Sequence, residues 1–141
     1  MNITGIKTLD HAPNVVQEWL NVLRDTADLP ESQQAYMLLR ATLHAVRDWL
    51  SVDEAAQLSA QLPILIRGIY FEGWNPSSTP VHPRNKEAFL QRVNAGFTKD
   101  PLPDDEGAVT AVFALLKDHV SPGEIDDVVQ AMPKDIRRLW P

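Results

Sequence analysis

Arg67 and Arg137 are the residues best suited to chemistry, because each follows by one helical turn a proline, Pro63 or Pro133, that can begin a helix. Two guanidinium groups can hold an anion, or the carboxylate of a partner, by paired hydrogen bonds. Alternatively, each arginine pairs with an acid or with helix-end carbonyls of its own segment and serves the fold. We favour the structural role and keep both arginines as candidate binding residues.

Trp74 is the third candidate binding residue. It closes an aromatic cluster with Tyr70 and Phe71 beside a segment rich in Pro, Gly and Ser. Such a cluster can form a platform for a ligand or a contact for a partner. The alternative, which we favour, is that Trp74 holds this segment over the core while Gly73 supplies the turn.

Metal, cofactor and catalytic sites are not predicted. His44 and Asp48 lie one helical turn apart and offer at most two metal ligands. The acidic runs 104–106 and 126–127 are typical of helix starts and solvated faces, whereas acid–base catalysis needs two carboxyl groups in unlike environments. The chain has no cysteine, no glycine-rich phosphate loop and no G-x-S-x-G turn. We therefore favour a protein that is not an enzyme.

Composition narrows the class further. A chain of 141 residues predicts one domain, 1–141, that buries its own core. The net charge of −6 repels phosphate backbones, so we expect no nucleic-acid partner. The segment 1–12 lacks the apolar run of a signal peptide, and the most apolar segment, 62–71, is interrupted by Arg67 and is shorter than the roughly 20 residues that span a bilayer. We expect a cytoplasmic protein without membrane insertion.

Helix-start signals and apolar spacing predict eight helices and no strand. Ser51 with Glu54, and Ser121 with Glu124, have the spacing of a capping box, in which two backbone N–H groups are satisfied reciprocally. Central apolar faces are expected on the second and sixth helices. The predicted elements are a helix over about 14–25 after Pro13, one from near Pro30 capped by Asp28, one opened by Ser51, one opened by Pro63, one around Phe89, one around Phe113, one opened by Ser121, and one from Pro133 to Trp140.

The sequence overlays itself without a gap after a shift of seventy residues. The matches fall on caps, helix starts and core positions, and they include Ser51 with Ser121, Pro63 with Pro133, Arg67 with Arg137, and Leu43 with Phe113. A repeat that cannot bury its apolar face alone can bury it against its copy. We predict two four-helix repeats, 13–72 and 83–141, joined by a linker, 73–82, and packed about an approximate two-fold axis. Parallel stacking of the repeats is the alternative.

The chain resembles a known family in the stretches QLPILIRGIYFEGW at 61–74, Phe89-Leu90, and MPKDIRRLWP at 132–141. With these motifs it is similar to the bacterial Domain of Unknown Function 2267 family, from about Val15 to its end. The resemblance implies a helical protein and no established activity, and it supplies no catalytic residues.

Taken together, these observations predict a non-catalytic helical module that binds a protein partner or forms a homo-oligomer. The alternative is an unrecognised enzyme or small-ligand-binding protein, with a pocket at the junction of the repeats near Arg67, Trp74 and Arg137. Nucleic-acid binding through the third and fourth helices is a third and weaker reading, because the chain is acidic and the segment 64–66 is apolar.

Overall fold

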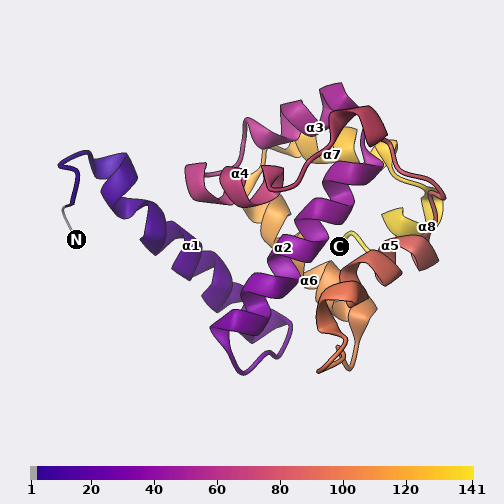
Figure 1. Ribbon diagram of the computed structural model, residues 1–141, viewed down its shortest axis with the longest axis horizontal. Coiled ribbons are helices and arrows are strands. Elements are labelled where there is room, and N and C mark those ends of the chain that lie inside the picture. The colour runs from indigo at the N-terminus through magenta and orange to yellow at the C-terminus, as the bar shows by residue number, and fades with distance from the viewer. Residues whose placement is uncertain (1–2) are drawn as a thin grey trace.

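The computed structural model describes residues 3–141 and is built of helices, with no strand in this range (Figure 1). Both the all-α class and the number of eight α-helices are confirmed. Among these residues, none of the helices is long and apolar enough to cross a membrane. The helices are α1 (Lys7–Thr26), α2 (Ser32–Trp49), α3 (Val52–Ser59), α4 (Ile64–Phe71), α5 (Lys86–Asn94), α6 (Asp105–His119), α7 (Pro122–Ala131) and α8 (Lys134–Arg137), with 3₁₀ turns η1 (Pro76–Ser78) and η2 (Ala95–Phe97).

Helix α2 runs through the middle of the molecule and contacts α1, α4, α5 and α6 (Figure 1). Its side chains at the predicted apolar face, Leu39, Leu43, Val46 and Leu50, are fully buried. Helix α6 also contributes several core residues and packs on α1, α2, α5 and α7. The five apolar residues at helical spacing in this segment are all buried, namely Val109, Val112, Phe113, Leu116 and Val120. The central place of these two helices is therefore confirmed.

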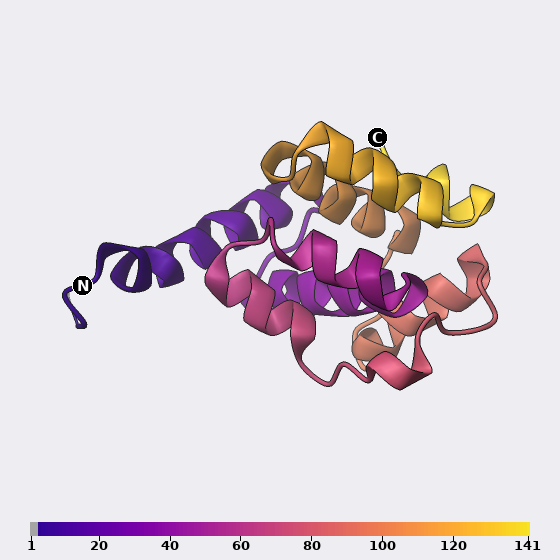
Figure 2. The same ribbon diagram turned by 90° about the horizontal axis from the view of Figure 1, so that it is seen from above.

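Helix α1 begins at Lys7, seven residues before the predicted start, and carries Pro13 in its interior. The Asp10 carboxylate accepts hydrogen bonds from the backbone N–H of Thr4 at 2.9 Å and of Gly5 at 3.0 Å. These bonds hold the residues before α1 against its first turn. The early half of α1 projects away from the other helices (Figures 1 and 2). The prediction was wrong because it took Pro13 for a helix start.

Two predicted capping boxes have different outcomes. The box of Ser51 and Glu54 is confirmed, with the Glu54 N–H donating to Ser51 Oγ and the Ser51 N–H donating to Glu54 Oε1. At Ser121 only the first half forms, because the Ser121 N–H donates instead to Oε1 of Gln61, at 2.7 Å. The Gln61 amide nitrogen in turn donates to Ser121 Oγ at 3.0 Å. Gln61 thus takes the place of Glu124 and joins the end of α3 to the start of α7.

Two other helix boundaries differ from the prediction. Helix α2 is capped by Glu31, whose N–H donates to Oε1 of Gln34, while Asp28 lies in the preceding turn with a φ of 54°. Helix α8 ends at Arg137 rather than at Trp140. The Trp140 ring has left the helix and stacks on Phe113, with 4.0 Å between ring centroids.

The segment 73–82, predicted as a linker, is irregular apart from η1 and is fixed to the carboxyl end of α2. The Val81 N–H donates to the carbonyl oxygen of Asp48 at 2.7 Å. Just beyond the segment, Arg84 Nη2 donates to the carbonyl oxygens of Trp49 at 3.0 Å and Ala131 at 2.6 Å. The chain between α4 and α5 is therefore held against the ends of α2 and α7.

Candidate functional site

Arg67 points back toward the turn between α3 and α4. Its Nε donates to the carbonyl oxygen of Ser59 at 2.8 Å, and its Nη2 donates to those of Leu62 at 2.9 Å and Ala60 at 3.3 Å. These carbonyls have no partner within α3 because the helix ends there. Arg67 therefore donates to backbone carbonyls at the end of α3 and in the turn that follows it.

Arg137 makes the same kind of contact at the turn between α7 and α8. Its Nε donates to the carbonyl oxygen of Met132 at 2.8 Å, and its Nη2 donates to that of Gln130 at 2.7 Å. The acceptors of Arg67 include Ala60 and Leu62, which lie seventy residues before these two. Each guanidinium is thus bonded to carbonyls of its own segment.

Trp74 follows α4 and packs against its last turn. The Trp74 and Phe71 ring centroids are 5.1 Å apart, and the Trp74 N–H donates to the carbonyl oxygen of Phe71 at 3.1 Å. Gly73 has a φ of +70°, a conformation that other residues rarely adopt. Trp74 is half-buried and packs on the core cluster.

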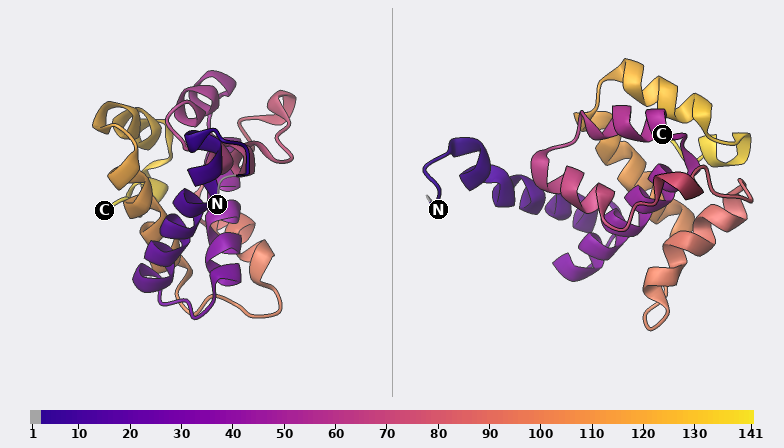
Figure 3. Two further views of the ribbon diagram at one scale, coloured as in Figure 1. Left: turned by 90° about the vertical axis from the view of Figure 1, so that its left-hand side faces the viewer. Right: turned by 45° about the horizontal axis from the view of Figure 1, so that its top comes forward.

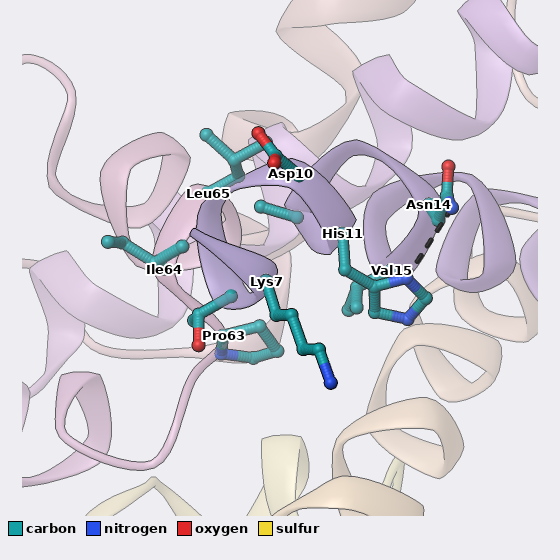
Figure 4. A pocket seen from close by; sticks show the side chains of 10 residues that line it. Lys7, Asp10, His11, Asn14, Val15, Pro63, Ile64 and Leu65 are labelled. Atoms are coloured by element: carbon teal, nitrogen blue, oxygen red, sulfur yellow. Dashed lines mark hydrogen bonds between the residues drawn. The ribbon is translucent and has the colours of Figure 1, made fainter. Parts of the chain in front are cut away.

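The largest of the cavities described here, about 630 Å³, lies elsewhere, between the early half of α1 and the start of α4 (Figure 4). We call it the α1–α4 groove. Arg67, Trp74 and Arg137 do not line it. Three smaller cavities, of about 300, 320 and 230 Å³, lie along the turns at 26–34 and 96–108. The residues lining the groove are Lys7, Thr8, Asp10, His11, Ala12, Asn14 and Val15 of α1 with Pro63, Ile64 and Leu65.

The α4 side of the groove is apolar and exposed. Ile64 and Leu65, in the first turn of α4, leave 47% and 43% of their surface to solvent. Ile6, 55% exposed, and Leu9, 41% exposed, lie near the start of α1 but do not line the groove. An exposed apolar pair beside a cavity is a candidate site of interaction.

The α1 side of the groove is polar. Hydrogen bonds from Thr4 and Gly5 hold the pKa of the Asp10 carboxyl below its ordinary value, and they occupy its oxygens. The Asn14 amide nitrogen lies 3.4 Å from His11 Nδ1. Lys7 makes no ion pair with any residue of 3–141.

Sequence reasoning missed this groove. Its two sides come from segments almost fifty residues apart, and their approach follows from the packing of α1 on α4. The detectable signal was the pair Ile64-Leu65, two apolar residues at the solvent-facing start of a short helix. In the sequence, the apolar segment 64–66 indicated only that nucleic-acid binding is a poor fit.

A second polar cluster, at the end of α2, is closed. Arg47 is 2% exposed, its Nε donates to Asp48 Oδ1 at 2.8 Å, and its Nη1 donates to the carbonyl oxygens of Tyr70 and Glu72. Arg92 pairs with the second oxygen of the same carboxylate. All these donors and acceptors are satisfied, so the cluster fastens α4 and α5 to α2. Helices α4 and α5 both pack on α2, and Figure 3 gives two further views of the molecule.

The two candidate metal ligands are also engaged. His44 Nε2 lies 2.7 Å from the carbonyl oxygen of Ile69, and the Asp48 carboxylate is held by two arginines. Residues 3–141 contain no group of three His, Cys, Asp or Glu side chains arranged to hold a metal ion.

The chain matches the model of a protein family. The model of a family described as "Uncharacterized conserved protein (DUF2267)" matches residues 16–139. No curated protein matches the chain. The matched span contains α4 but not residues 7–15, which form the α1 side of the groove.

Proposed function

The chain belongs to the DUF2267 family of uncharacterised conserved proteins, and we propose that it is a non-catalytic helical interaction module that docks a protein through the α1–α4 groove. The observation that carries the proposal is the exposed apolar pair Ile64 and Leu65 facing the projecting end of α1 across a cavity of about 630 Å³. Apolar surface of this kind is stabilised when a partner covers it.

The proposal includes two repeats, 13–72 and 83–141, joined by the linker 73–82 within one domain, 1–141, and related by an approximate two-fold axis. Two kinds of contact support it. Arg67 and Arg137 bond to carbonyls at matching positions of the two repeats. Ser51 and Ser121 both accept a hydrogen bond from the N–H three residues later.

The contacts between the predicted repeats also favour a two-fold axis over parallel stacking. Helix α1 packs on α6, and α2 packs on α5. Under a shift of seventy, α1 corresponds to α5 and α2 to α6, so these two contacts exchange with each other. Helices α3 and α7, which correspond, pack against each other, as do α2 and α6. Reciprocal contacts of this kind are typical of a two-fold interface.

The apolar side of the groove lies in the first proposed repeat, and the equivalent positions of the second repeat are polar. At the positions of Ile64 and Leu65, the second repeat has Lys134 and Asp135, and the Asp135 carboxylate caps α5 by accepting from the Lys86 N–H at 2.9 Å. Helix α1 needs no cap there because it continues upstream to Lys7. An extended α1 and an apolar start of α4 thus occur together, which supports a docking role specific to this end of the molecule.

The alternative is an enzyme or small-ligand-binding protein with a pocket at the junction of the repeats, near Arg67, Trp74 and Arg137. It has less support, since both guanidinium groups donate to backbone carbonyls and Trp74 packs on α4. The proposal also takes the protein to be cytoplasmic and to have no nucleic-acid partner, in keeping with its net charge of −6.

Comparative affinity purification tests the proposed function. The chain, Leu65→Asp and Val52→Asp are each recovered from cells of the source organism, and the co-purifying proteins are quantified. Val52 is the matched control, because it is 40% exposed and, like Leu65, lies in the first turn of a helix, where an added acid is tolerated. We expect proteins that are retained by the parent and by Val52→Asp and lost with Leu65→Asp. Identical recovery with all three contradicts the proposal.

A further inference from the structure

We infer that the Ser121 N–H exchanges between two acceptors, Gln61 and Glu124, so that the start of α7 is bonded either to the first proposed repeat or to its own helix. The inference goes beyond the proposed docking function and does not depend on it. The structure holds the first arrangement, in which the Ser121 N–H donates to Gln61 Oε1 at 2.7 Å and Gln61 Nε2 donates to Ser121 Oγ at 3.0 Å. Because Gln61 lies in the turn between α3 and α4, these two bonds join that turn to α7.

Glu124 is placed to accept the Ser121 N–H instead. It is the third residue of α7, the position from which the acid of a capping box reaches back to the residue before the helix. Its own N–H already donates to Ser121 Oγ at 3.3 Å, so the backbone of the box is formed. Its carboxylate accepts no hydrogen bond from residues 3–141 and makes no ion pair with them. The exchange therefore needs only rotations of two side chains.

The equivalent serine of the first proposed repeat, Ser51, holds the second arrangement. Its N–H donates to Glu54 Oε1 at 3.0 Å, which closes the capping box. Under the proposed two-fold axis, the residue that stands toward Ser51 as Gln61 stands toward Ser121 is Ala131, seventy residues after Gln61. The Ala131 side chain has no acceptor to offer. The presence of a glutamine at this position therefore accounts for the open box in one repeat and the closed box in the other.

The charge of Glu124 sets the balance between the two arrangements. An ionised carboxylate in the first turn of a helix is a stronger acceptor of a backbone N–H than a neutral amide. Partial burial raises the pKa of the Glu124 carboxyl, and the neighbouring acids Asp127 of α7 and Glu54 of α3 add to this effect. The Tyr70 hydroxyl of α4 also lies within reach of its charge. The bond to Gln61 is therefore favoured as the pH falls through the pKa of Glu124, and the bond to Glu124 is favoured as the pH rises through it.

The exchange acts on the turn that leads into the α1–α4 groove. Gln61 lies two residues before Pro63 and three before Ile64, which both line the groove. Arg67 holds this turn from within the first proposed repeat, whereas the bonds of Gln61 tie it to the second. The acceptor of the Ser121 N–H thus decides whether this tie between the edge of the groove and α7 is present.

A double-mutant cycle on the full chain tests the exchange. In Gln61→Ala, the Ser121 N–H is expected to pass to Glu124. Glu124→Ala should therefore raise the equilibrium constant of unfolding about fivefold more in the presence of Gln61→Ala than in its absence, because only there does it remove a cap. Glu54→Ala is the matched control and should have the same effect with and without Gln61→Ala. Equal effects of Glu124→Ala in the two backgrounds overturn the inference.

A pH titration followed by NMR observes the exchange itself. In the parent, the Ser121 amide proton resonance should shift with the midpoint of the Glu124 carboxyl, and Glu124→Ala should abolish this shift. The pKa of the Glu124 carboxyl should be lower in Gln61→Ala than in the parent, since an N–H donor favours the charged form. A Ser121 resonance that does not follow Glu124, or an unchanged pKa of Glu124 in Gln61→Ala, overturns the inference.

Discussion

Arg67 and Arg137 donate from their guanidinium groups to the carbonyl oxygens five residues earlier, at Leu62 and Met132, with distances of 2.9 and 2.8 Å. The two bonds stand seventy residues apart and close the turn before α4 and the turn before α8. Each arginine lies one helical turn after the proline that precedes its helix, Pro63 before α4 and Pro133 before α8. The proline prevents the helix from extending further toward the amino terminus. An arginine therefore makes the same hydrogen bond to a turn carbonyl at both positions.

Substituting either arginine by lysine should lower the free energy of unfolding by about 1–2 kcal/mol, because lysine keeps the charge and loses the planar fork of donors. Urea denaturation of Arg67→Lys and Arg137→Lys measures this. Similar losses in the two variants are expected from the proposed repeat. Unchanged stability in both, together with weaker partner binding, would favour a binding role for the pair instead.

Leu43 is fully buried in the central face of α2. Leu43→Ala should cost about 2–5 kcal/mol, because the cavity that it leaves cannot fully collapse. Val22→Ala is the control on an exposed apolar residue, 41% exposed on α1, and should change stability by less than about 0.5 kcal/mol. An unchanged melting midpoint for Leu43→Ala would show that this face of α2 is not the core.

Asp48 stands between two arginines of unequal burial. Asp48→Ala leaves the buried Arg47 without its carboxylate and should cost about 3–5 kcal/mol. The Arg92 side chain is 40% exposed, so Arg92→Ala should cost less than about 1 kcal/mol. Chemical denaturation of the two variants compares them. Equal costs would mean that Arg47 is compensated by some group other than Asp48.

We expect the stability of the protein to depend on pH through His44. Burial lowers the pKa of the ring from its ordinary value of 6.5, and the nearby cation of Arg47 adds to this effect, although the bond to the Ile69 carbonyl opposes it. The unfolded state therefore binds the proton more readily than the folded state. The free energy of unfolding should be highest, as far as His44 determines it, above about pH 6.5, and it should fall as the pH drops below this value.

Measuring unfolding between pH 7.5 and 5.5 checks this, with His44→Gln as the control, since glutamine can still donate to the Ile69 carbonyl. The slope should be smaller in the variant. Glu124 acts in the opposite sense, because desolvation and nearby acids raise the pKa of its carboxyl. Its contribution is common to both proteins and leaves their difference intact. Equal slopes would rule out His44 as the source.

Much of the fold followed from local signals in the sequence. Ser51 and Glu54 form the predicted box, and the stripes around Leu43 and Phe113 are buried, because caps and helical spacing act within a few residues. The start of α1 did not follow, since its cap links Asp10 to Thr4 on the far side of a proline.

The site was harder to predict for a tertiary reason. The sequence analysis could name Arg67 and Arg137 from their positions, yet the groove depends on how α1 crosses the start of α4. The burial of Arg47 is likewise set by carbonyls of Tyr70 and Glu72, more than twenty residues away. Neither relationship leaves a periodic trace in the sequence.

The most direct test of the docking function is site-specific photo-crosslinking in cells of the source organism. A photoreactive phenylalanine derivative replaces Leu65 in the groove in one strain and the control residue Val52 in another, both exposed to a similar degree. The account predicts a discrete adduct from position 65, absent from position 52, in which mass spectrometry finds a peptide of a partner protein. Indistinguishable adducts from the two positions, or none from either, would contradict it.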